Sequence, residues 1–229
     1  MQAGVIRVSD SQLVGGTLST ESGGLVQLFG ETSLERVAID GQVDIASGAV
    51  VEVVDSLSLL NDSQVTLEPP SGDECSVDCH AEGGQLIATE ITGSGELELN
   101  DSTSIAQATG TLTIGGDVTV RGGGGSIGVK QHPLIINGKL SADDGRIVVN
   151  GSEVSVDDAS LKAIDGSLEI NGLVGTISDV EAAGQGTITL DGSYTVVGQA
   201  GDPVATDGAT IELAGRYSVG VIVRSCVLG

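Results

Sequence analysis

The sequence predicts an all-β chain in which residues 1–229 form one domain, a right-handed parallel β-helix with three short strands per coil of about 20 residues. Three observations predict this fold. Gly provides 36 of the 229 residues without a collagen-like period, aromatic residues make up only 1%, and a short pattern recurs along the C-terminal half. No window has the i, i+3, i+4 apolar spacing of a helix, so we expect no long helix.

The recurring pattern is a Gly, then apolar residues two apart, then Asn or Asp and usually a second Gly. It occurs at 145–151, 166–172 and 186–192, and again at 208–215 with one extra residue. Equivalent apolar residues of successive coils should stack in columns about 4.8 Å apart. The expected columns are Ile127, Ile147, Leu168, Ile188 and Ile211; Leu134, Val154, Val174 and Val196; and Leu140, Leu161, Val180 and Val204.

The N-terminal half has the same character, with short strands expected at 24–28, 42–45, 50–54 and 64–67. About eleven coils would then form a rod on the order of 50 Å long. Two prolines follow Leu67, so residues 68–84 are expected to form a loop excursion from one coil. The glycine run at 121–126 is expected to be a flexible turn. A pair of β-sandwiches is the rival fold, but sandwich cores usually recruit aromatic residues.

Charge excludes some partners. The net charge of −23 repels phosphate, so we expect no nucleic-acid partner, and no apolar run approaches the length of a membrane helix, so we expect no membrane insertion. Fifteen acidic residues and no basic residue lie between Arg36 and Arg121. Such a flank should attract divalent cations loosely, and a saline habitat would also explain it.

Three segments, 110–120, 138–151 and 165–172, resemble the repeats of bacterial autotransporter passengers and filamentous-haemagglutinin-type adhesins. The resemblance implies a secreted β-helix at the cell surface or outside the cell, with structural or adhesive work. The opening residues do not read as a secretory signal, which indicates an intracellular protein, a mature form or an excised piece.

Cysteine usage leaves alternatives open. Cys75 and Cys79 are expected to close a small disulfide ring, which would indicate an oxidising compartment; free thiols or half of a zinc site with His80 are the alternatives. Cys226 is either a buried thiol or the partner in an intermolecular bridge.

Aspartate precedes the repeat glycine at three places, Asp144, Asp165 and Asp207. If these carboxylates stack, they are candidate Ca²⁺ ligands. The competing interpretation, which we favour, is that they are turn residues that tolerate a left-handed backbone. No other cofactor is expected.

Parallel β-helices include polysaccharide lyases and hydrolases, so catalysis was considered. Lys130, Arg146 and Lys162 fall in adjacent coils and would be its candidate residues. The aromatic platforms that hold sugars are missing, and no nucleophile, His and acid can be grouped. We therefore expect a protein that is not an enzyme.

The expected function is a non-catalytic extracellular structural or adhesive rod whose subunits stack end to end, the strand at 217–223 meeting the strand at 4–8 of the next copy. The residues expected in this contact are Val5, Val8, Tyr217, Val219, Val221, Val223 and Cys226. One alternative is an adhesin module that binds a host or cell-surface glycan or protein through the 68–84 loop. A β-helix lyase is the other.

Overall fold

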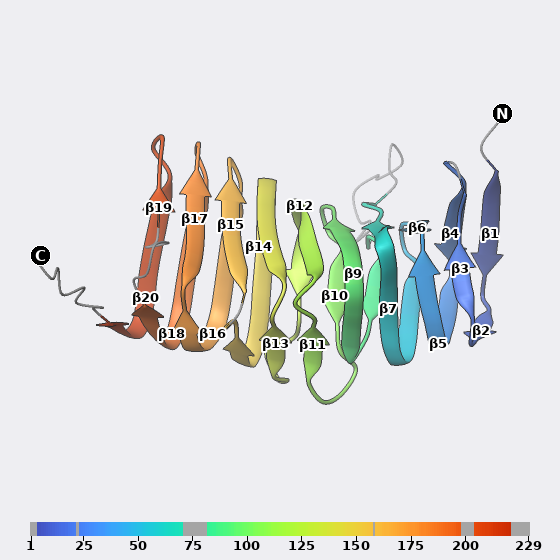
Figure 1. Ribbon diagram of the computed structural model, residues 1–229, viewed down its shortest axis with the longest axis horizontal. Coiled ribbons are helices and arrows are strands. Elements are labelled where there is room, and N and C mark those ends of the chain that lie inside the picture. Colours follow the sequence, from blue (N-terminus) through green and yellow to red (C-terminus); the bar gives the residue numbers. More distant parts are fainter. Residues whose placement is uncertain (1–3, 22, 71–81, 158, 198–203, 221–229) are drawn as a thin grey trace, which may run out of the picture.

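The computed structural model describes residues 4–21, 23–70, 82–157, 159–197 and 204–220. In these ranges every regular element is a strand, and the strands pair in parallel to form one β-solenoid of about nine turns, about 21 residues apart. Figure 1 shows the coils in a single row, with the N-terminal strands at one end and β20 at the other. The predicted parallel β-helix is confirmed.

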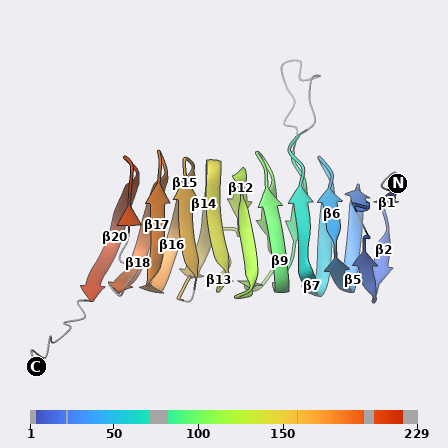
Figure 2. The same ribbon diagram turned by 45° about the horizontal axis from the view of Figure 1, so that its top comes forward.

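Three strand stacks, which we call faces A, B and C, form the sides of the solenoid (Figure 2). Strands confined to one face are short. On face A they are β1 (Val5–Ser9), β4 (Leu25–Phe29), β6 (Gln42–Ile45), β15 (Ser160–Ile164), β17 (Asp179–Ala183) and β19 (Val204–Ala205). On face B they are β2 (Gln12–Val14), β8 (Gln85–Ile87) and β10 (Ser104–Ala106), and on face C β3 (Thr17–Ser19), β11 (Leu112–Ile114) and β13 (Leu134–Ile136).

Longer strands turn the corners between faces. They are β5 (Glu31–Asp40), β16 (Ser167–Ile177), β18 (Thr187–Val197) and β20 (Thr210–Gly220) from B to C; β9 (Glu90–Leu99) from C to A; β12 (Val118–Ile127) from A to B; β14 (Lys139–Ser155) from A through B to C; and β7 (Val50–Leu67) from B through C to A. Each coil therefore contributes one rung to each face.

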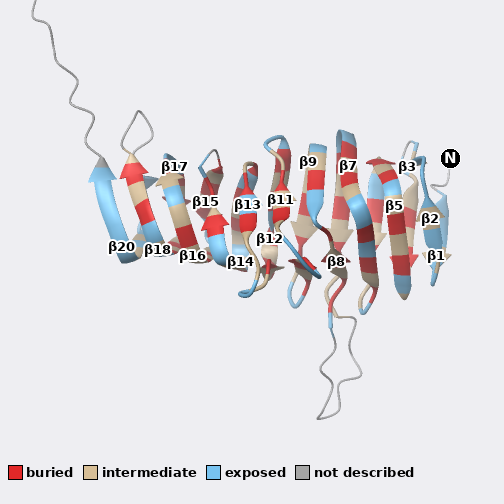
Figure 3. Ribbon diagram, turned by 90° about the horizontal axis from the view of Figure 1, so that it is seen from below, coloured by how far each residue is buried: buried red, intermediate tan, exposed pale blue. Residues whose placement is uncertain are grey.

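Aliphatic columns fill the interior. The longest lies behind face A, with every member at most 3% exposed: Val26, Val43, Val65, Leu97, Val120, Leu140, Leu161 and Val180. Figure 3 shows the buried positions as bands that repeat from strand to strand. Because strand side chains alternate, the residues between two buried columns point outward and form polar rows on the surface.

The number of coils differs from the expected eleven. The expectation came from dividing the chain length by the period, which assigns every residue to a coil. In the structure, however, β7 ends at Leu67 and the next strand, β8, begins at Gln85. The described residues between them, 68–70 and 82–84, belong to no strand; residues 71–81 lie outside the described ranges, as do the residues before Gly4 and after Gly220. Nine spacings of about 4.8 Å give a row on the order of 43 Å long.

Each of the three expected columns is correct only in part. Ile147, Leu168, Ile188 and Ile211 do align, but Ile127 pairs with Val149. The second column runs from Leu134 and Val154 to Leu173, because a register shift after Asn150 displaces the expected Val174 by one residue. In the third column Val204 pairs with Glu181 and is exposed. Bulges at corners shift the register without changing the repeat pattern, so spacing alone does not locate them.

The glycine run after Arg121 is part of a strand, which corrects the expected flexible turn. Gly122 has a φ of +144° and lies so close to the preceding coil that a Cβ would overlap the carbonyl oxygen of Leu99. The repeat glycine Gly145 likewise contacts the carbonyl of Gly123, which leaves no room for a side chain. Close contact between successive coils explains why glycine occupies these corners.

Replacing Gly145 by Ala should lower the free energy of unfolding by about 1–3 kcal/mol, the range for overpacking a tight site. The matched control is Gly116→Ala, because the nearest atom to its Cβ position is 3.7 Å away and its φ lies outside the left-handed region. Thermal and urea unfolding would measure both variants. Equal stability of the two would contradict the steric explanation.

Candidate functional site

Face A carries a continuous outward row of polar residues. Its rungs, which we call the polar ladder, are Gln27, Asp44, Thr66, Glu98, Arg121, Ser141, Lys162 and Glu181, each paired in register with the next. Arg7 precedes Gln27 in the same row and donates from Nε to Gln27 Oε1 at 3.4 Å; the rungs from Gln27 to Glu98 carry amide, carboxylate or hydroxyl groups, and the next basic residue is Arg121. The sequence analysis did not find the polar ladder, because consecutive rungs lie about 20 residues apart and belong to no local motif.

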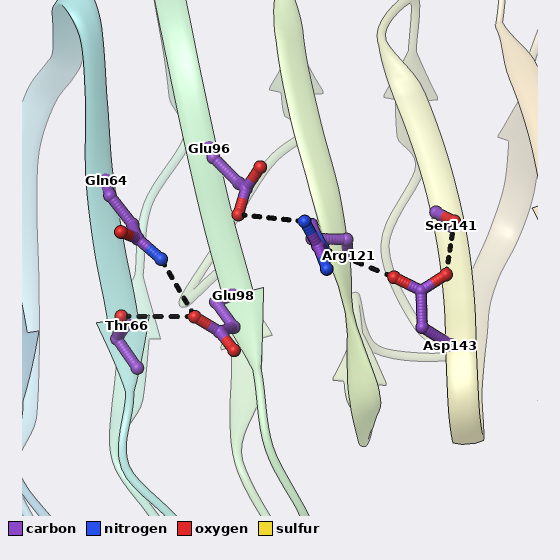
Figure 4. Close-up of polar contacts among 7 residues, drawn as sticks. All are labelled: Gln64, Thr66, Glu96, Glu98, Arg121, Ser141 and Asp143. Carbon is purple, nitrogen blue, oxygen red and sulfur yellow. Dashed lines mark hydrogen bonds and ion pairs between the residues drawn. The ribbon is translucent and has the colours of Figure 1, made fainter.

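Side chains of the polar ladder and its neighbours bridge successive coils (Figure 4). Gln64 Nε2 donates to Glu98 Oε2 at 2.9 Å. Arg121 lies between two carboxylates, with Nε 3.2 Å from Asp143 Oδ2 and an Nη 3.7 Å from Glu96 Oε1. Ser141 Oγ in turn donates to Asp143 Oδ1 at 2.7 Å. Arg121 thus connects three successive coils, because the carboxylates it contacts belong to the coil before it and the coil after it.

Replacing Arg121 by Gln should destabilise the rod by about 1 kcal/mol at low salt, because two partly exposed ion pairs are lost. For a chain of this size that corresponds to a melting temperature about 2–4 °C lower. The loss should shrink in molar salt, which screens such pairs. Arg36→Gln is the control, since within the described residues Arg36 forms its ion pair with Glu35 of its own strand. A salt-independent loss would contradict the electrostatic account.

Between Gln27 and Arg121 the rungs of the ladder include two carboxylates, Asp44 and Glu98, and no basic residue. Burial raises the pKa of Asp44, repulsion from Glu98 adds to the effect, and a hydrogen bond with Gln27 opposes it. Burial also raises the pKa of Glu68, and repulsion from Asp44 and Glu98 acts in the same direction. The folded state therefore binds protons at Asp44 and Glu68 more readily than the unfolded chain does. At neutral pH these two charges oppose folding.

The double variant Asp44→Asn, Glu68→Gln should melt about 1–3 °C higher than the parent at pH 7. The advantage should disappear as the pH falls through the raised pKa values of Asp44 and Glu68, because the parent then takes up the same protons. The double variant Glu90→Gln, Glu153→Gln, at two exposed sites, controls for the same change in net charge. Melting curves across this pH range are the measurement, and a pH-independent advantage would show that repulsion is not its source.

The three aspartates proposed as Ca²⁺ candidates lie at positive-φ corners: Asp144 at 64°, Asp165 at 57° and Asp207 at 58°. Asp165 Oδ1 accepts the backbone N–H of Gln185 in the next coil at 2.9 Å, and its carboxylate occupies the space that a Cβ on Gly184 would fill. Since 184 is the next corner, Asp165 and Asp207 lie two coils apart. In the described ranges no group of three His, Cys, Asp or Glu residues is arranged to hold a metal.

The same corner device recurs elsewhere. In each case a side-chain oxygen accepts a backbone N–H of the next coil and lies where a Cβ of the preceding glycine would be. The oxygen, the N–H and the glycine belong to Asp10, Glu31 and Gly30; to Thr20, Gln42 and Gly41; and to Asp157, Thr176 and Gly175. The Asp165 corner therefore has a structural role that it shares with three others. Ca²⁺ binding by the candidate aspartates stays a prediction.

Of the three basic residues considered for catalysis, Arg146 and Lys130 lie near the same carboxylate and Lys162 lies on another face. Arg146 is on face B and pairs with Glu169, whose pKa is lowered by hydrogen bonds from Asn171 and Arg146. Lys162 is on face A, 3.0 Å from Glu181 Oε2. Lys130 lies near enough to Glu169 to help lower its pKa. The three residues are thus divided between faces, and Arg146 and Lys162 each form an ion pair with a carboxylate.

Apolar exposure concentrates at the two ends, which appear pale in Figure 3. Large hydrophobic residues exposed there are Val5 (53%), Ile6 (59%) and Val14 at the N-terminal end, and Val204, Tyr217 (50%) and Val219 (61%) at the other. The expected contact residue Val8 is only partly buried against the core. The sequence analysis missed Ile6, which alternation would have placed above the core column of Val26.

An aromatic pair closes the described part of face C. The ring of Tyr217 stacks on that of Tyr194, with centroids 6.0 Å apart and an interplanar angle of 19°. Tyr194 is buried, which raises its pKa, and its hydroxyl donates to the Leu190 carbonyl at 3.0 Å. A shallow pocket beside the pair is lined by Ser193, Thr195, Arg216 and Ser218.

Other expected site residues, Cys75, Cys79, Val221, Val223 and Cys226, lie outside the described residues. In the described ranges no helix is long and apolar enough to cross a membrane.

Comparison of the chain with protein-family models, with curated proteins and with solved structures found no match. The parallel β-solenoid is therefore the part of the adhesin resemblance that the structure supports.

Proposed function

We propose that this chain is a non-catalytic structural or adhesive rod, displayed outside the cell or on its surface, whose subunits join end to end. The observation that carries the proposal is the state of the two ends. Three parallel ladders run through all described coils and finish as open strand edges, beside apolar side chains that are half exposed or more. Unpaired parallel edges with exposed core residues favour pairing with further strands.

Charge supports contact at the ends rather than along the sides. The coil at 4–19 has one Arg and one Asp, and the coil at 204–220 has one Arg against two acidic residues, whereas residues 37–120 hold fifteen acidic residues and no basic one. Sideways association would bring the strongly negative middle sections together. End-to-end contact separates them by the length of the rod, so repulsion is least in that arrangement.

The extracellular location, the adhesive role and contact with a glycan or protein of a host or cell surface rest on the resemblance to adhesin repeats. For the alternative binding module, deletion of the 68–84 loop should abolish binding to such a partner while the melting temperature is retained. For the alternative lyase, Arg146→Ala and Lys162→Ala should abolish release of unsaturated sugars from an acidic polysaccharide.

Negative-stain microscopy and sedimentation of the purified chain test the assembly, with and without Ca²⁺ and reductant. We expect fibres one rod wide that lengthen with protein concentration and with salt, because salt screens the net charge of −23. Introducing charge at an end, as in Ile6→Glu or Val219→Glu, should abolish the fibres. Leu60→Glu, at an exposed apolar site in the middle of the rod, is the control. Separate rods at every concentration and salt would contradict the proposal.

A further inference from the structure

We infer that the joint between two copies keeps the strand register of the solenoid, so that β19 and β20 of one copy continue into β1, β2 and β3 of the next, with Tyr217 placed against Gly16. This inference rests on the proposed end-to-end assembly and specifies its geometry. The occupant of each end is thus a second copy of this chain, related by a head-to-tail contact that propagates.

The faces decide which strands meet. β1 starts face A, whereas the second half of β20, residues 215–220, ends face C, which starts at β3. Pairing β20 with β1, as the sequence suggested, would set face C on face A and leave the other rungs unmatched. Continuing all three faces places β19 beside β1, residues 210–214 beside β2, and residues 215–220 beside β3.

Register then fixes individual partners. One column of face C passes through Val37, Leu57, Ile91, Ile114 and Ile136. Extending the register of Leu134, Val154 and Leu173 by two residues leads from Ile136 to Gly175, which is exposed, and pairing then leads to Tyr194 and Tyr217. Gly16 precedes Val37 in this column, since its carbonyl accepts the N–H of Ala38 at 3.0 Å. In the neighbouring column Leu18 starts and Val219 ends.

The two ends of this column are complementary in size. Tyr217 is half exposed although it stacks on Tyr194, so one side of its side chain packs against none of the described residues. A Cβ on Gly16 would meet no atom within 4 Å, so its φ of +94°, and not packing within its own subunit, favours glycine there and leaves open space. In the inferred joint the Tyr217 ring would enter the space above Gly16, while Val219 would cover Leu18.

The same register brings Glu212 next to Asp10 on face B. A continuous series of paired residues leads from Glu31 through successive coils to Glu212, and Asp10 lies one coil before Glu31. Two carboxylates in adjacent rungs repel each other. Glu212→Gln should therefore strengthen assembly, a gain that a purely structural role for Glu212 would not produce. Its control is Glu153→Gln, an exposed carboxylate in the middle of the rod.

Cysteine cross-linking tests the register directly, in a background with Ser at positions 75, 79 and 226 that still sediments as fibres. In the inferred joint Thr17 lies beside Ser218, and paired strands are about 4.8 Å apart, which suits a disulfide. On oxidation, the double variant Thr17→Cys, Ser218→Cys should form a series of covalent oligomers. Their yield should be at least about tenfold higher than that from the control variant Val5→Cys, Ser218→Cys. The two ends of one rod are too far apart for an internal bridge.

A second measurement uses variants that keep the three native cysteines. Gly16→Val should abolish fibres, whereas Gly15→Val, also at positive φ with no neighbouring atom, should retain them. The inferred register would be wrong if fibres cross-linked through positions 5 and 218 instead of 17 and 218, or if they still formed with Gly16→Val. The proposed end-to-end assembly would be retained in both cases. If no variant assembles, including Glu212→Gln, the proposed function fails as well. Assembly only after removal of residues 221–229 would show that this segment, and not a second copy, occupies that end.

Discussion

The backbone hydrogen bonds between successive coils are the interaction on which the rest of this molecule depends. Apart from local turns, a rung finds its partners in the coils before and after it, and an unpaired peptide group in a dry setting costs free energy comparable to a lost hydrogen bond. The ladders therefore fix the spacing of all coils at once. The aliphatic columns follow from this spacing, because side chains about 4.8 Å apart stack directly on one another.

That spacing also determines the corners. Where a chain turns from one face to the next, its backbone comes against the carbonyl groups of the neighbouring coil, as at Gly122 and Gly145. Where the corner leaves a backbone N–H without a ladder partner, an Asp or Thr of the preceding coil accepts it, and a glycine provides the space, as Asp165 and Gly184 show. Glycine and aspartate are thus frequent for a reason that involves two coils.

Sequence periodicity was sufficient to predict the fold, because one short pattern indicates both a strand and the turn that follows it. The alternation at Ile147 and Val149 predicted the columns that continue through Leu168 and Ile170. Bulges were not predictable, since the register shift after Asn150 depends on how a corner packs against its neighbour. The polar ladder was missed for a related reason: Arg121 and Asp143 lie 22 positions apart in the sequence and are brought together only by stacking.

In the proposed end-to-end assembly, the distribution of charge favours contact at the ends of the rod. Each coil in the acidic section repels its neighbours, yet the ladders hold them together, with Arg121 and Lys162 as local counter-charges. Between subunits no covalent chain holds the coils, so the first and last coils must meet with little repulsion, and these are the sections that are close to neutral. Since one end starts each face and the other finishes it, two like ends cannot continue a parallel ladder. Charge thus favours the ends as the place of contact, and strand direction favours head-to-tail order.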